Sequence, residues 1–215
     1  MNRNLPRPNV DSKLIEFNAI LDDSLLLATD AVNFHEIRGG HLRPIRRTRI
    51  CQINEMAFLG MFLAWEDFLE ESFIRYMCGA VTGTHYCPKV YVSPTNLDHA
   101  LKFFIVKPRD YVEWSSGQQV IERAEMVFRD GEPYKSAIRP LLTDLDDMRQ
   151  IRNSIAHRSG TSWRRFEALV RRILGSRPRR LTPGLFLGLT HAGVGRPYIQ
   201  HYKDVLSVAA SRIVR

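Results

Sequence analysis

The sequence predicts an all-α fold. Apolar residues recur three and four positions apart through most of residues 11–77 and 141–174, and clusters of Gly and Pro separate these stretches. Hydrophobic residues make up 44% of the 215 positions and charged residues 25%, which is ordinary for a chain that buries one core. We expect one domain over residues 1–215, with a helical core at about 11–175, an insertion at about 80–131, an irregular segment at about 176–199 and a closing helix at 202–214.

The first helix is expected to begin at Asp11 or Ser12, either of which can cap it, and to end near Phe34. Gly39-Gly40 and Pro44 then interrupt the helical pattern, so we expect a solvated loop between the first two helices. This loop and the start of the next helix carry a group of arginines: Arg43, Arg46, Arg47 and Arg49.

The longest helix is expected over about residues 48–77, where two apolar stripes follow helical spacing. The first stripe comprises Phe58, Phe62, Trp65, Leu69, Phe73 and Tyr76. The second stripe comprises Met56, Leu63, Ile74 and Met77. Two apolar faces imply two packing partners, and the second face is covered either within the chain or by a second subunit.

The insertion after this helix is expected to be irregular over residues 80–94, except for a short strand at Lys89–Val92. Shorter helices are predicted at 96–104 and 115–128, on either side of Lys107-Pro108. Pro140 precedes a helix over 141–157, and Thr161 or Ser162 can cap a further helix that ends at Leu174.

The helix over 141–157 places an arginine among apolar residues. Leu145, Met148 and Ile155 share one face, and Arg152 falls among them, beside Asn153 and His157 on the flank. One interpretation is structural: Arg152 reaches an acidic partner, and His157 caps the last turn of the helix.

A second interpretation comes from the pattern Arg-Asn-x-x-x-His, which resembles the motif of HEPN domains, and most of all the RiboL-PSP-like HEPN proteins. The resemblance implies an antiparallel helical bundle with an inserted loop and short-helix segment. It also implies a metal-independent endoribonuclease that cleaves single-stranded RNA, with Arg152, Asn153 and His157 catalytic and no cofactor or metal. Glu66 or Glu70 is a candidate for an acid that pairs with Arg152 or orients His157.

The chemistry of RNA cleavage suits these residue types independently of the resemblance. Histidine titrates near neutrality and can move protons, Arg152 can bind the phosphate, and Asn153 can hold His157 or the phosphate by hydrogen bonds.

A homodimer is expected for three reasons. Arg152 buried on an apolar seam of its own chain would have its charge stranded, the longest helix has two apolar faces, and one His would otherwise perform both proton transfers. The resemblance further implies a toxin or defence effector, controlled by an antitoxin or another regulatory partner protein.

The formal net charge of +8 and the isoelectric point near 9.7 favour polyanionic partners such as nucleic acid, and the resemblance implies that this partner is RNA. Between Arg149 and Arg180 there are ten arginines and a single acid, Glu167, so the positive charge concentrates around the motif. The residues expected to bind nucleic acid are Arg149, Arg158, Arg164, Arg165, Arg171 and Arg172. The alternative is that this face is merely solvated and that the arginines reflect a GC-rich coding sequence.

The three cysteines cannot all be bridged and form no CxxC pair, which favours a reducing cytoplasm. The apolar run over 56–65 is about half of what a bilayer span needs, so no membrane association is expected.

Two other functions remain open: an RNA- or nucleotide-binding HEPN protein without catalysis, and a basic helical interaction module or DNA-associated protein.

Overall fold

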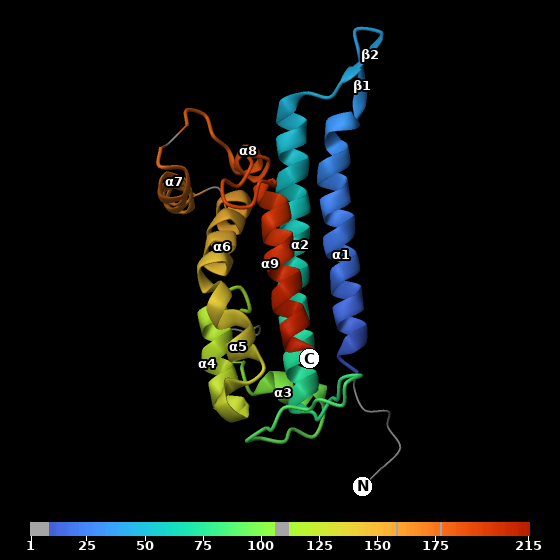
Figure 1. Cartoon of the computed structure of the whole chain (residues 1–215), viewed down its shortest axis with the longest axis vertical. Coiled ribbons are helices and arrows are strands. Elements are labelled where there is room, and N and C mark those ends of the chain that lie inside the picture. The colour runs from blue at the N-terminus through green and yellow to red at the C-terminus, as the bar shows by residue number, and fades with distance from the viewer. Residues whose placement is uncertain (1–8, 106–111, 158, 177) are drawn as a thin grey trace. The chain divides into compact units, whose positions relative to one another are not determined.

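The computed structural model describes residues 9–105, 112–157, 159–176 and 178–215, and these residues are mainly helical, as expected (Figure 1). The elements in chain order are α1 (Asp11–Asp30), β1 (His35–Arg38), β2 (His41–Pro44), α2 (Arg47–Met77), α3 (Leu97–Lys102), α4 (Gly117–Val127), α5 (Tyr134–Ile138), α6 (Leu142–His157), α7 (Gly160–Leu174), α8 (Pro183–Leu187) and α9 (Tyr198–Ile213). The expected Lys107-Pro108 break between helices lies outside the described residues.

The chain divides into two compact units, each assembled from segments that are far apart in the sequence. Unit 1 comprises the described residues of Met1–Asn18, Trp65–Leu145 and Ser207–Arg215. Unit 2 comprises those of Ala19–Ala64 and Asp146–Leu206. The long helices α1, α2, α6 and α9 each contribute residues to both units.

Aromatic rings around Phe73 of α2 form the core of unit 1. The ring centroids of Phe128 and Tyr134 each lie 4.8 Å from that of Phe73. The buried hydroxyl of Tyr134 donates to Ser72 Oγ (2.9 Å), which satisfies a polar group that would otherwise be costly to bury. Tyr76, one turn further along α2, donates its hydroxyl proton to the backbone carbonyl of Ile213 (2.9 Å).

The core of unit 2 is a second aromatic cluster, contributed by α2, α7, α8 and α9. Phe58 and Tyr202 have ring centroids 6.0 Å apart, and Phe186 stacks on Tyr198 at 4.4 Å. Phe166 of α7 meets Phe186 edge-on at 6.1 Å, and all five rings are buried. Burial of each such ring stabilises the fold by roughly 1.5–3 kcal/mol, and the ring contacts join α7 to α8, α8 to α9, and α9 to α2.

The two stripes expected on α2 differ in their burial. All six residues of the first stripe, Phe58 to Tyr76, are buried as expected. The second stripe is covered only toward its C-terminal end, where Ile74 and Met77 are buried. Met56 and Leu63 remain 65% and 51% exposed, so part of the second face is uncovered in the single chain.

The connection between α1 and α2 is an antiparallel β-hairpin, and the expectation of a loop there is wrong (Figure 1). Gly39 and Gly40 both have positive φ, +59° and +79°, as a two-residue hairpin turn requires. The Glu36 carboxylate pairs with Arg46 and Arg49, which fixes the hairpin to the start of α2. The short strand expected at Lys89–Val92 is absent among the described residues, because Val90 forms only an isolated bridge with Phe128.

The segment expected to be irregular at about 176–199 contains the one-and-a-half-turn helix α8, and α9 begins four residues earlier than expected, at Tyr198. Gly184 of α8 lies directly against α2. Its backbone N–H donates to Glu55 Oε1 (3.0 Å), and its carbonyl accepts from Asn54 Nδ2 (3.1 Å). Two consecutive side chains of α2 therefore hold both polar groups of this residue.

Within the described ranges, no helix has both the length and the apolar character that crossing a bilayer demands.

Candidate functional site

The motif residues lie on the C-terminal half of α6, within unit 2. Leu145, Met148 and Ile155 are buried along the apolar face of this helix, as their spacing predicts. Arg152 and Asn153 are half-buried, and His157, the last residue of α6, is exposed. The helix therefore carries the motif from the edge of the core to the solvent.

The Arg152 guanidinium is stabilised by groups of its own chain. Its carbon Cζ lies 5.9 Å from the centroid of the Phe62 ring, within the range of a cation–π contact, and Nη1 donates to Asn153 Oδ1 (3.0 Å). A contact of this kind contributes roughly 0.5–2 kcal/mol, depending on desolvation. The charge of Arg152 is thus not stranded within the single chain, which removes one of the three reasons for expecting a dimer.

The hydrogen bond from Arg152 also orients the Asn153 amide. Because Oδ1 accepts from Arg152, the Nδ2 group directs its two N–H donors elsewhere. His157 follows Asn153 by four residues, which places the two side chains one turn apart on the same side of α6. The Asn153 amide and the exposed His157 therefore share one side of α6, and the Arg152 guanidinium is joined to this side through its hydrogen bond to Asn153.

Arg149 is engaged with the carboxylate of Asp146. Asp146 accepts from Arg149 Nη2 (2.7 Å) and from Gln150 Nε2 (2.8 Å). Partial burial opposes ionisation of Asp146, but these two hydrogen bonds and the charge of Arg149 outweigh it. They hold the pKa of the carboxyl below its ordinary value of 3.8. The charge of Arg149 is thus partly offset by Asp146, although only its Nη2 group is engaged there.

The helix α7 carries an exposed cationic face. It begins with a capping box in which Ser159 caps the helix and Ser162 bonds back to it, so the cap lies two or three residues before the expected one. Its buried side packs Phe166, Leu169 and Val170 into the core. The side facing away from the core is lined by Arg164, Arg165 and Arg171, all exposed, and none of the three pairs with an acid of the described chain.

Arg172 belongs to this helix but has a structural partner. Its Nη2 donates to Oδ1 of Asp147, whose side chain is only 7% exposed. This hydrogen bond and the charge of Asp147 raise the pKa of Arg172 above its ordinary value, against the opposing effect of partial burial. Arg158, which the sequence also assigns to nucleic-acid binding, lies outside the described residues.

The two acids considered as partners of the motif, Glu66 and Glu70, are both half-buried residues of α2 that belong to unit 1. Glu70 accepts a hydrogen bond from Trp114 Nε1 (2.7 Å), which gives it a structural role in that unit. A role for Glu66 or Glu70 in orienting the motif stays a prediction.

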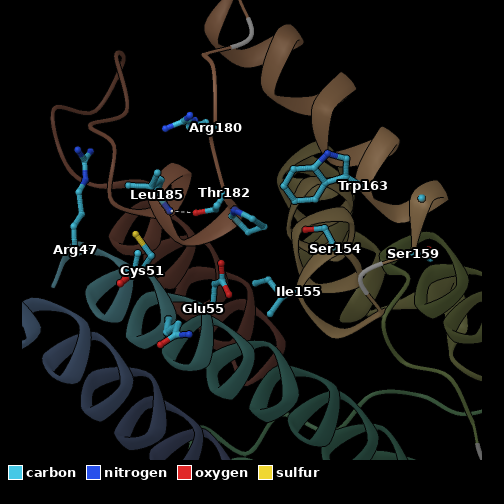
Figure 2. Close-up of a pocket in the computed structure, with 14 residues that line it drawn as sticks. Arg47, Cys51, Glu55, Ser154, Ile155, Ser159, Trp163, Arg180, Thr182 and Leu185 are labelled. Atoms are coloured by element: carbon cyan, nitrogen blue, oxygen red, sulfur yellow. Dashed lines mark hydrogen bonds between the residues drawn. The ribbon is translucent and has the colours of Figure 1, made fainter.

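Next to the motif helix, unit 2 contains a pocket of about 710 Å³ that the sequence did not predict. Its lining comes from residues within 47–55 of α2, 154–155 of α6, 159–163 around the start of α7, and 180–185. Figure 2 shows Trp163 on one side of the pocket and Arg47 on the other, with Cys51 and Glu55 between them in this view.

The pocket combines apolar walls with a few polar groups. Burial is the main reason that the pKa of the Cys51 thiol lies above its ordinary value of 9.0, and it outweighs the opposing charge of Arg47. Cys51 is therefore protonated at neutral pH, which disfavours it as a nucleophile. Residue spacing predicts only a core position for Trp163 and a place in a group of arginines for Arg47. Packing between residues more than 100 positions apart unites them in one pocket.

Among the described residues, no three His, Cys, Asp or Glu side chains gather where they could hold a metal ion. Comparison of the chain with protein-family models, with curated protein sequences and with solved structures gives no match. The site must therefore be interpreted from its own residues.

Proposed function

We propose that the protein is a metal-independent endoribonuclease of the HEPN type that cleaves single-stranded RNA with Arg152, Asn153 and His157. The observation that carries this proposal is the arrangement at the end of α6. There the Arg152 guanidinium, in contact with Phe62, donates a hydrogen bond to the Asn153 amide, and the exposed His157 follows Asn153 by one helical turn. The exposed arginines of α7, which follows α6 within a few residues, support RNA as the substrate because they match a polyanion.

Cleavage at a ribose proceeds by attack of the 2′-oxygen on the adjacent phosphorus. The bond from phosphorus to the 5′-oxygen breaks, and the products are a 2′,3′-cyclic phosphate and a 5′-hydroxyl. The 2′-hydroxyl gives up a proton, and the departing 5′-oxygen takes one up. His157 would move these protons, while Arg152 and the Nδ2 group of Asn153 would offset the charge that develops on the phosphorane oxygens.

A single imidazole acts either as base or as acid at a given moment, so we propose that two motifs meet in a homodimer. The uncovered part of α2 supports this proposal, because Met56 and Leu63 are exposed one above the other, seven residues apart on the same face. Unregulated RNA cleavage would arrest growth. The setting we propose is accordingly a cytoplasmic toxin or defence effector restrained by an antitoxin or another regulatory protein.

The experiment that tests the catalytic proposal compares the parent protein with His157→Ala on single-stranded RNA in the presence of EDTA. We expect the parent to leave 2′,3′-cyclic phosphate ends and His157→Ala to lose activity by at least about 100-fold, as removal of a general acid–base group does. His41→Ala, which alters an exposed histidine of the hairpin, is the matched control. Full activity of a folded His157→Ala protein would exclude the proposed role.

The dimer proposal has its own test. Leu63→Glu places a charge on the uncovered face of α2, whereas Leu42→Glu does so at the exposed hairpin and serves as the control. We expect Leu63→Glu to sediment as a monomer and to lose cleavage, and Leu42→Glu to retain both properties of the parent. A parent protein that sediments as a monomer and cleaves at full specific activity would refute the shared site.

An RNA-binding protein without catalysis is the second candidate, because the pocket beside α6 offers a binding site that needs no chemistry. RNA binding by the parent without any His157-dependent cleavage would favour it. Preference for duplex DNA over RNA would instead favour a DNA-associated module.

A further inference from the structure

The pocket in unit 2 is a site distinct from the catalytic motif. Taking Arg152 as the origin, Asn153 and His157 lie at about 100° and 140° around the α6 axis, whereas the pocket-lining Ser154 and Ile155 lie at about 200° and 300°. A volume of about 710 Å³ falls in the range that encloses a small molecule. The described residues that line the pocket do not include Arg152, Asn153 or His157.

Two cations lie at the pocket. Arg47 is the first residue of α2, and Arg180 precedes α8; both are exposed, and neither forms an ion pair with an acid of the described chain. Arg180 has a φ of +60°, an uncommon conformation for a residue other than glycine. Guanidinium groups that are not engaged with carboxylates suit a phosphate, which they bind through paired N–H donors.

An aromatic ring forms one wall. The half-buried Trp163 donates its indole N–H to Glu167 Oε1 (2.6 Å), which fixes the plane of the ring. Trp163 lines the pocket, and Figure 2 shows its ring directed toward the centre of the view. A fixed indole of this kind provides a surface on which a nucleobase can stack.

A carboxylate lies in the same pocket. Glu55 Oε1 accepts from the Gly184 backbone N–H (3.0 Å), which holds the side chain in place. Its Oε2 accepts no hydrogen bond from any residue in the described ranges, and it therefore remains available to a ligand that donates. Among nucleobases, guanine presents two adjacent kinds of donor on its Watson–Crick edge, N1–H and the 2-amino group, whereas uracil presents one.

We infer that this pocket binds one guanosine phosphate unit, with guanine against Trp163 and Glu55 and the phosphate at Arg47 and Arg180. A free nucleotide and a nucleotide within an RNA strand offer the same chemistry, so the experiment must distinguish them. The inference does not depend on the proposed cleavage activity, because no motif residue takes part.

The test follows alkylation of Cys51, which lines the pocket. The full chain carries Cys78→Ser and Cys87→Ser, which leaves Cys51 as its one thiol among three cysteines, and His157→Ala, which prevents cleavage of added RNA. Mass spectrometry measures the rate of iodoacetamide reaction with guanosine 5′-monophosphate, uridine 5′-monophosphate or inorganic phosphate present. Two further samples contain a short oligouridine strand with or without one central guanosine.

We expect guanosine 5′-monophosphate or the guanosine-containing strand to protect Cys51 at a concentration about tenfold lower than its uridine counterpart. Trp163→Leu, and separately Arg47→Gln with Arg180→Gln, should raise that concentration by about tenfold or more. Arg43→Gln with Arg212→Gln, at exposed positions that do not line the pocket, should leave it unchanged. Glu55→Gln keeps an acceptor for Gly184 and should abolish the preference for guanosine.

Protection by the free nucleotide would identify a mononucleotide site. Protection by the guanosine-containing strand alone would identify a site for one nucleotide of RNA. Either result supports the inference. No protection by any of these probes, equal protection by uridine compounds, or protection that the pocket variants leave unchanged would overturn it. None of these outcomes is affected by failure of the cleavage experiment, since the alkylation test uses an inactivated motif.

Discussion

Substitution of Gly184 by alanine should displace α8 from α2. A Cβ at this position would lie 2.1 Å from the carbonyl oxygen of Cys51, 2.7 Å from its carbonyl carbon and 2.9 Å from its Cα. All three are backbone atoms of a long helix, so they cannot move aside as the end of a flexible side chain would. The hydrogen bonds from Gly184 to Glu55 and from Asn54 to Gly184 would lengthen together.

Overpacking of this kind costs about 1–3 kcal/mol, and loss of a partner for the buried Asn54 amide costs about 1–3 kcal/mol more. Because the two costs are not additive, we expect a total loss of about 3 kcal/mol, which lowers the melting temperature of a chain of this length by roughly 6–12 °C.

The assay is thermal unfolding followed by circular dichroism or calorimetry. The matched control is Gly160→Ala, at the first residue of α7, where a Cβ would have no atom within 4 Å. That change should leave the stability equal or slightly higher, because alanine restricts the unfolded chain. A Gly184→Ala protein that melts within about 2 °C of the parent would refute the argument from close contact, given the size of shift expected.

Three further predictions concern the arginines of α7 and the thiol in the pocket. Arg172→Gln should lower the free energy of unfolding by about 1–3 kcal/mol, because the buried Asp147 carboxylate loses a charged partner, and urea denaturation measures this. Combined replacement of the exposed Arg164, Arg165 and Arg171 by Gln should instead preserve stability. It should also flatten the slope of log binding constant against log salt concentration for RNA, by about 0.7 for each phosphate that is no longer neutralised. Equal losses of stability in the two variants, or an unchanged salt slope, would contradict the assignment of Arg172 to the fold and of the other three arginines to RNA binding. Because burial disfavours the thiolate, alkylation of Cys51 in the Cys78→Ser, Cys87→Ser protein should increase with a midpoint above pH 9.0, and a midpoint at or below 9.0 would contradict it.

The long helices could be predicted because their signal is local. Phe58, Phe62 and Trp65 repeat at helical spacing and are all buried. The hairpin could not be predicted in this way, since its strands are only four residues long. Its apolar residues Ile37 and Leu42 are 80% and 72% exposed, so no buried apolar face marks the strands. The short helix α8 likewise depends on hydrogen bonds with α2, about 130 positions away.

The candidate site was predictable to the same extent. A contiguous motif on one helix places Arg152, Asn153 and His157 together without knowledge of any other segment. The contact of Arg152 with Phe62 and the pairing of Arg172 with Asp147 join separate elements, and residue spacing carries no information about them. For that reason residue spacing assigned Arg172 to RNA binding and did not reveal that Phe62 and Asn153 contact Arg152.

The hairpin between α1 and α2 has a consequence for association between molecules. A sheet of two strands has two open edges, and exposed apolar residues such as Ile37 and Leu42 make an open edge prone to pair with a strand of another molecule. Arg38 and Arg43 lie next to them on the two strands, and β2 ends at Pro44, which has no N–H to donate. Charge repulsion and the missing donor therefore oppose growth of this small sheet into an aggregate.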